Sequence, residues 1–389
     1  MGAMLFSPRE ASGTSWLPDA TPMYGITQQV GRWELMWHGN AFAQLLYDGG
    51  DRGHTQGGSI NWMMGMARRE LAGGQFGVRG MLSAEPATIA GCGYPDLLAT
   101  GEACDGHAIH DRQHPHDLFM EAAAEYDHPV SGTLRWQAYA GLAGEPALGP
   151  AAYPHRLSAM PNPLAPISHH WIDATHITFG VVTAGIYDRR WKAETSVFNG
   201  REPDEHRWDM DLAALDSVSG RLWFMPSPSV VLQVSAGHLA EAEANHDGGG
   251  RMDVDRITAS ATYHRQLEPG DVWATTAAWG RNEWNGESSN AFLLESNLTL
   301  DQRHTWFGRF EAVGKPGHDL DVHSGGVFTV AKLQAGYTRY FDAWHGLQPG
   351  IGGSGSLGVV PRSLEPLYGN RVNPGLAIFV TMRPAAHGM

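Results

Sequence analysis

Apolar residues alternate with small or polar residues along this chain, in about sixteen separate segments. In the clearest segment the apolar row runs from Trp33 to Tyr47, while Glu34 and His38 lie on the opposite face. A period of two residues is that of a β-strand. The apolar rows are rich in Ala, Gly and Trp, and the charged residues keep to the other parity. This composition favours a surface that meets lipid over the packed core of a β-sandwich.

The pattern predicts an all-β protein, a transmembrane antiparallel up-and-down β-barrel of about 16 strands. A barrel of about 14 strands is the alternative, because segment 349–360 is rich in glycine. The predicted strands are 32–47, 59–69, 75–85, 117–127, 133–142, 175–187, 190–198, 215–225, 229–239, 254–266, 271–281, 289–300, 303–313, 326–341, 349–360 and 373–383.

The connections between these segments alternate in length. Short turns such as 72–74 and 188–189 alternate with long loops such as 86–116 and 143–174. Bacterial outer-membrane barrels are built in this way, with short turns in the periplasm and long loops outside the cell. We therefore expect a Gram-negative outer-membrane location, with both termini in the periplasm and with bilayer lipid and lipopolysaccharide around the barrel.

The composition agrees with a membrane barrel and limits the partners. Only 17% of the 389 residues are charged, against about 25% in typical soluble domains. No run of about 18 apolar residues is available for a spanning helix. The net charge of -14 argues against nucleic acid as a partner and makes cations the more natural ligands. No signal peptide opens the chain, so we expect a mature form or a signal upstream.

No linker divides the chain, and residues 31–389 are predicted to form one barrel. Residues 1–30 do not alternate; they form either a periplasmic N-terminal segment or a plug in the lumen. Cys92 and Cys104 lie close together in a segment rich in Gly and Asp. They form either a disulfide, worth at most about 3 kcal/mol of loop entropy, or two free thiols.

The inward parity of the strands carries charged residues of both signs. These residues can form ion pairs across neighbouring strands or line a water channel, and the sequence leaves both alternatives open. The predicted lumen residues are Arg79, Arg135, Glu194, Arg221, Arg309, Glu311 and Lys332.

Histidines gather in two of the long loops, on the predicted outer rim. Strands two places apart lie roughly 10 Å from each other, so the two loop ends can converge, with His176 pointing inward on the sixth strand. Imidazole suits Cu and Zn, and carboxylates serve as further ligands or orient the rings. A metal-cation site is the hypothesis, and hydrogen bonding of the histidines within the loops is the alternative. The candidate ligands are His114, His116, Asp117, Glu121, His169, His170 and His176.

The sequence favours no enzymatic reaction. Ser168 stands beside His169, but a chain with 20 histidines offers many such neighbours. A nucleophile elbow, a P-loop and a dinucleotide fingerprint are all absent from the sequence. We therefore expect no catalysis and no certain cofactor, with Cu or Zn as the candidate ions.

Three stretches, 111–119, 168–180 and 198–205, carry a resemblance to a known family. There, and over most of its length, the chain resembles a family of largely uncharacterised bacterial outer-membrane β-barrel proteins. In general plan it is also similar to the outer-membrane proteins of copper and heavy-metal resistance loci. Members often begin with a His- and Met-rich segment, which residues 1–30 lack. The resemblance implies an outer-membrane location and no particular substrate or catalytic residue.

The sequence therefore predicts a porin-like channel or binding protein for small solutes, metal cations foremost, that selects them at a His- and acid-rich extracellular mouth. The alternative is a plugged barrel with a structural role, which scaffolds a periplasmic or surface partner protein and transports nothing.

Overall fold

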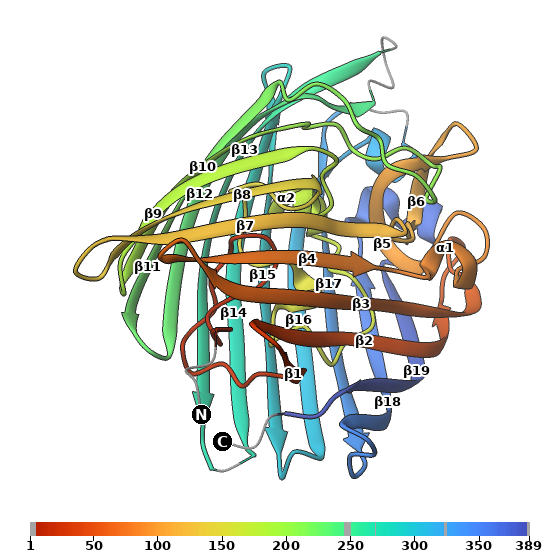
Figure 1. Ribbon diagram of the computed structural model, residues 1–389. Helices are drawn as coiled ribbons and strands as arrows, with labels where there is room; N and C mark the ends of the chain where they lie inside the picture. The colour runs from red at the N-terminus through yellow and green to blue at the C-terminus, as the bar shows by residue number, and fades with distance from the viewer. Residues whose placement is uncertain (1–4, 245–249, 269, 323–324, 387–389) are drawn as a thin grey trace.

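The computed structural model describes residues 5–244, 250–268, 270–322 and 325–386. Sixteen antiparallel strands pair in sequence order, and β19 pairs with β2 to close the barrel (Figure 1). The predicted sixteen-strand barrel is confirmed. Its strands are β2 (Trp33–Asp48), β3 (Thr55–Leu71), β4 (Gly74–Leu82), β7 (Phe119–Ser131), β8 (Leu134–Ala143), β9 (Val181–Tyr187), β10 (Trp191–Phe198), β11 (Ser217–Ser227), β12 (Val230–Ala244), β13 (Arg251–Gln266), β14 (Val272–Trp284), β15 (Glu287–Leu300), β16 (His304–Pro316), β17 (Val327–Tyr340), β18 (Leu347–Val359) and β19 (Val372–Pro384).

The apolar parity of the strands faces outward. On β2, Trp37 and Leu45 are 46% and 48% exposed, whereas Asn40 and Gln44 are buried on the inner face. In a closed barrel the backbone N–H and C=O groups of the strands are hydrogen-bonded to neighbouring strands. A wall of this kind with an apolar outer face can therefore span the hydrocarbon core of a bilayer. An even-stranded antiparallel barrel with this exterior is an outer-membrane protein, as the alternation predicted. None of the described helices is long and apolar enough to cross a membrane.

Several predicted strands begin later than expected, and two of these differences have a clear cause in the structure. The sixth barrel strand, expected from residue 175, begins at Val181, because α2 (His169–Ile172) and a 3-10 helix (Ala174–His176) occupy the preceding residues. The expectation that His176 points inward from a strand is therefore wrong. The fourth strand, expected from residue 117, begins at Phe119, because the backbone N–H of Leu118 donates to Arg207 instead of to the neighbouring strand.

Three strands outside the predicted set are also present. β1 (Ile26–Val30) pairs with the first half of β2, beside the point where β19 ends. β5 (Tyr94–Cys104) and β6 (His107–Gln113) form a separate hairpin in the loop between β4 and β7, after α1 (Glu85–Thr88). Shorter helical turns lie in the other loops: 3-10 helices Tyr153–His155, His318–Leu320 and Arg362–Leu364, and α3 (Glu365–Tyr368).

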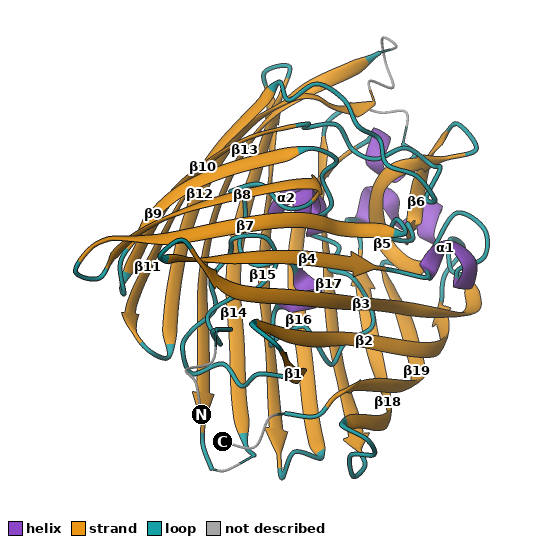
Figure 2. Cartoon of the chain, viewed as in Figure 1, coloured by secondary structure: helices purple, strands orange, loops and turns teal. Residues whose placement is uncertain are grey.

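Inserted chain fills much of the barrel interior. Nearly every residue from 144 to 179 is buried, and α2 in this loop lies against β13, β14 and β15 (Figure 2). Described residues of the N-terminal segment contact inward-facing side chains of the wall. Arg79 donates to the backbone oxygens of Ala11 and Gly13, and Arg221 donates to the hydroxyl of Thr14.

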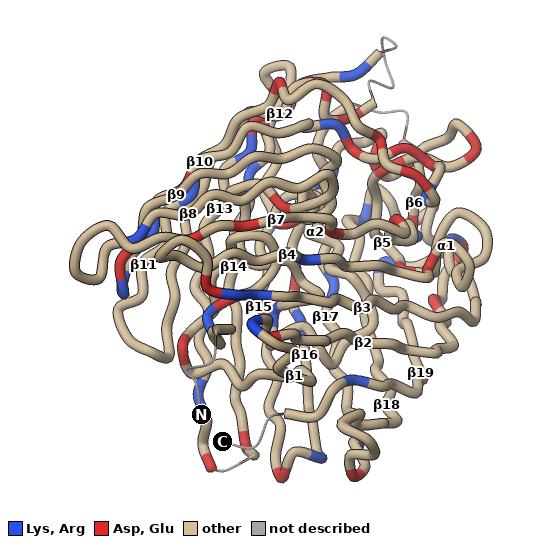
Figure 3. Tube along the Cα trace, in the orientation of Figure 1, with Lys and Arg blue, Asp and Glu red and all other residues tan. Residues whose placement is uncertain are grey.

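The predicted lumen residues are paired with neighbouring strands or with the inserted chain. The partners are Glu125 for Arg79 (2.8 Å), Asp127 for Arg135 (2.7 Å), Arg221 for Glu194 (2.8 Å), Glu145 as a second partner for Arg221 (3.1 Å), Glu295 for Arg309 (3.2 Å), the Ser168 hydroxyl for Glu311 (2.7 Å) and Asp96 for Lys332. The interior charges thus tie neighbouring strands to each other and, through Asp96, Glu145 and Ser168, tie the inserted loops to the wall. Figure 3 shows acidic positions gathered in the loops beside β6.

Candidate functional site

Two loops bring five histidines together inside the barrel, around the ring of Tyr153. Loop 83–118 carries His114 and His116, and loop 144–180 carries the others. The centroids of neighbouring rings lie 5.0 to 6.5 Å apart. All five histidines are buried. We call this group the histidine cage; its members are His114, His116, His169, His170 and His176, with Tyr153.

An oxygen that can only accept faces the Nδ1 atom of every histidine in the cage. Carboxylates face four of them: Glu85 for His116 (2.9 Å), Asp173 for His169 (2.8 Å), Glu202 for His170 (2.9 Å) and Glu102 for His114 (3.2 Å). Backbone oxygens face two: Pro115 for His114 as well (3.1 Å), and Asp173 for His176 (3.0 Å). The proton of each neutral ring therefore sits on Nδ1, and Nε2 keeps its lone pair.

These Nε2 atoms have little else to bind. Among the described residues, the buried Nε2 atoms of His114, His170 and His176 have no hydrogen-bond partner. His116 differs, because its Nε2 lies 3.0 Å from the hydroxyl of Tyr153. A ring held by an oxygen at Nδ1 and free at Nε2 is arranged as metal-binding histidines are.

The cage histidines divide into two electrostatic groups. Burial lowers the pKa of His169 to about 4 and the pKa values of His114 and His176 well below the ordinary value, so these rings are neutral at neutral pH. Burial also opposes the charged forms of His116 and His170, but Glu85 and Glu202 outweigh it and raise both pKa values.

The cage is not a closed metal site as it stands. Among the described residues, no three ligand atoms of these histidines lie within 4.8 Å of one another. The two predicted carboxylate ligands are engaged elsewhere: Asp117 pairs with Arg207 at 3.5 Å, and Glu121 accepts from Tyr139 at 2.7 Å. An ion could bridge two rings at a time, with further coordination from water.

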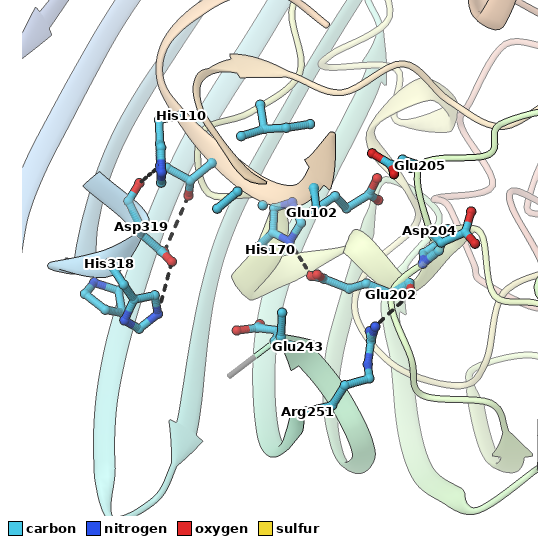
Figure 4. A pocket seen from close by; sticks show the side chains of 18 of the residues that line it. Glu102, His110, His170, Glu202, Asp204, Glu205, Glu243, Arg251, His318 and Asp319 are labelled. Carbon is cyan, nitrogen blue, oxygen red and sulfur yellow. Dashed lines mark hydrogen bonds and ion pairs between the residues drawn. The ribbon is translucent and has the colours of Figure 1, made fainter. Parts of the chain in front are cut away.

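An acidic pocket of about 210 Å³ opens beside the cage, among the loops next to β6 (Figure 4). The acidic residues that line it come from four segments: Glu102 from β5, Glu202, Asp204 and Glu205 from loop 199–216, Glu243 from β12 and Asp319 from the 3-10 helix at 318–320. Arg251 is the basic residue of the lining. His170 lines this pocket as well as the cage, so the two sites are contiguous.

The sequence predicted His170 as a ligand, but it did not bring the acidic residues of this pocket together, because they lie far apart in the chain. Glu102 shows the effect of their shared environment: burial raises its pKa to about 7, although Arg207 and His170 oppose the change. Nearby, Cys92 and Cys104 form a disulfide that joins the ends of the segment containing β5. This disulfide leaves neither sulfur available as a thiolate ligand.

The fold defines a sixteen-stranded outer-membrane β-barrel, and the comparisons agree on that fold. No protein-family model and no curated protein matches the chain. The anion-selective porin from Comamonas acidovorans is similar with a TM-score of 0.54 at 9% identity, covering 90% of this chain and 99% of the porin. OmpF of Salmonella typhi, in complex with daunomycin, gives 0.55 at 10% identity, covering 92% and 100%.

The outer-membrane channel DcaP of Acinetobacter baumannii gives a TM-score of 0.53 at 8% identity, covering 93% of this chain and all 100% of DcaP. At such identities the likeness shows the fold alone. The similarity to outer-membrane proteins of copper-resistance loci stays a prediction.

Proposed function

We propose that the protein binds small cations at its acidic outer mouth and passes transition-metal ions, Zn(II) or Cu(II), to the histidine cage. The observation that carries this proposal is the set of buried imidazoles whose Nδ1 atoms face acceptor oxygens. His114 and His176, both neutral at neutral pH, offer Nε2 lone pairs to a ligand. Buried acceptors without a donor are costly, and a cation would satisfy them.

The acidic pocket gives the cage a source of cations. Carboxylates that face one pocket repel each other, and they raise the local concentration of cations in a narrow cleft. His170 lies between the pocket and the cage, with Nδ1 held by Glu202 at 2.9 Å. The spacing of the cage rings favours weak binding of an ion at several successive places. Transport requires such weak binding, because an ion that is held tightly at one place does not leave.

A metal titration tests the proposal. We expect purified barrel to bind Zn(II) in isothermal calorimetry, and the triple variant His114→Ala, His116→Ala, His176→Ala to lose that binding. The matched control replaces three exposed histidines, His206, His238 and His345, by Ala and should bind as the wild type does. Equal binding by the cage variant would remove the proposed site.

A structural role is the second candidate, and the filling of the lumen favours it. With loop 144–180 and the N-terminal segment inside the ring, we expect a plugged barrel to give no conductance steps in planar bilayers. A cation channel with this mouth would instead give conductance steps. Their reversal potential in a KCl gradient would show selectivity for K⁺ over Cl⁻. Glu202→Gln with Glu243→Gln should weaken that preference.

A further inference from the structure

Sulfur-bearing side chains line one stretch of the inner wall, and none of them belongs to the histidine cage. Across β2 and β3, Met36 is paired with Met66 and His38 with Met64. Met64 and Met66 are 1% and 6% exposed, whereas Met63, directly before them on β3, is 58% exposed on the lipid face. The alternation of the strand therefore selects two of the three methionines for the interior.

Nitrogen and sulfur donors meet at this place. The Nε2 atom of His38 lies 3.0 Å from the Sδ atom of Met64. His155, from loop 144–180, brings a second imidazole, with its ring centroid 5.5 Å from that of His38. The indole of Trp62 lies against both histidines, at 5.3 Å from His38 and 4.7 Å from His155.

Met36, His38, Trp62, Met66 and His155 line a small pocket of about 80 Å³. Met64 does not line it, but its sulfur lies against His38. The N-terminal segment contributes Met23 and loop 144–180 contributes Met160, so three separate parts of the chain close it. A pocket of this size has room for an ion with a few waters. Glu10, the acidic residue in the lining, is already paired with Arg68.

We infer that this pocket is a site for a soft monovalent metal ion, Cu(I) or Ag(I), held by the thioethers of Met36 and Met66 and by the imidazole of His38, with the sulfur of Met64 beside His38 as a further donor. Thioether sulfur is a soft ligand that selects Cu(I), whereas Ca(II) and Mg(II) require oxygen ligands. The inference goes beyond the proposed function, because it uses other residues and another class of ion.

A set of methionine-to-leucine variants separates metal binding from packing. Methionine also fills irregular space in apolar interiors, and leucine nearly conserves its volume. The triple variant Met36→Leu, Met64→Leu, Met66→Leu therefore keeps the packing and removes the sulfur. Met63→Leu makes the same chemical change on the lipid face and serves as the matched control.

Ag(I) in nitrate buffer is the probe, titrated into the detergent-solubilised full chain by calorimetry. We expect one Ag(I) to bind the wild type and Met63→Leu equally, and the triple variant to lose affinity by about tenfold or more, as loss of ligand-shell groups does at other metal sites. X-ray absorption on the Cu(I)-loaded wild type should show sulfur and nitrogen neighbours. A triple variant that folds and binds Ag(I) like the wild type would overturn the inference.

The same titrations separate this inference from the proposed function. If the cage variant lost Zn(II) binding but kept Ag(I) binding, both sites would stand as independent. If the wild type bound Ag(I) but not Zn(II), the proposed function would fail and the thioether site would stand. If Ag(I) binding depended on His114, His116 and His176 instead, the thioether site would be wrong.

Discussion

Glu145 illustrates, at the scale of one residue, how the interior tolerates charge. Its side chain is buried, with its carboxylate 3.1 Å from Arg221, which also pairs with Glu194 at 2.8 Å. Burial raises the pKa of Glu145 from 4.5 to about 8, because the shared Arg221 offsets only part of the desolvation. The folded protein therefore retains a proton here that the unfolded chain releases near pH 4.5.

We expect loop 144–180 to be held more firmly at pH 6 than at pH 9. Because the folded-state pKa is raised, the stabilisation is fully present below pH 4.5 and is lost as the pH rises through about 8. Glu145→Gln should remove this pH dependence. Hydrogen exchange of the amides of residues 147–149, 151 and 152, corrected for intrinsic rates, measures it. An unchanged dependence in the variant would assign the titration to another group.

A second pH prediction belongs to the cage. Ordinary histidine sites lose metal as the rings protonate near pH 6.5. Here burial lowers the pKa of His169 to about 4, and it also lowers the pKa values of His114 and His176 well below the ordinary value. Zn(II) affinity should therefore persist at pH 5.5, as measured by calorimetry. A steep loss between pH 7 and pH 6 would contradict neutral, desolvated rings.

At the scale of elements, the docking of α2 on the wall depends on a glycine. A β-carbon on Gly280 of β14 would lie 2.1 Å from the backbone oxygen of Trp171 in α2. Only a residue without a side chain allows this approach. The position of the cage histidines at the start of α2 is set by the same contact, since His169 and His170 precede Trp171 directly.

We expect Gly280→Ala to push α2 away from the wall. Overpacking of this kind typically destabilises a structure by about 1–3 kcal/mol. We therefore expect loop 144–180 to be held less firmly in this variant. Limited proteolysis of the loop and Zn(II) affinity report the change. Gly80→Ala on β4 is the control, because a β-carbon there meets no atom within 4 Å. If both variants behaved like the wild type, α2 would not be positioned by this contact.

The strands were predictable from sequence wherever one face meets lipid along its whole length. Even the glycine-rich segment expected at 349–360 forms β18. The alternation fails for β5, because its first seven residues are all buried and neither face contrasts with the other. It fails for α2 for the same reason, so the start of β9 was placed too early.

The candidate site was predictable only in part. The convergence of the two histidine-rich loops followed from strand order, and the structure places the five histidines together. The roles of Glu85 and Tyr153 depend on how the loops fold inside the barrel, which no local pattern encodes. The inward methionines of β3 did have a signal, because Met64 and Met66 share a parity with the charged residues.

At the scale of the whole molecule, the barrel interior is filled by segments that do not belong to the strands of the wall. The N-terminal segment is held by charged groups of several strands: Arg68 contacts Glu10, Arg79 contacts Gly13 and Lys192 contacts Thr14. The backbone N–H of Ala20 donates to Pro228 in a short turn, at the end where Figure 1 shows both termini. Such a segment narrows any path to the periplasm.

Deleting residues 5–22, with β1 retained, should therefore raise the conductance of the barrel. A sixteen-stranded ring encloses an aqueous lumen unless something fills it, and the deletion removes one of the fillings while exposing Arg79 and Lys192 to water. Single-channel recording in planar bilayers should show larger steps than the wild type gives, in protein whose circular dichroism retains the full β-content. Equal conductance in the two proteins would mean that loop 144–180, and not the N-terminal segment, closes the path.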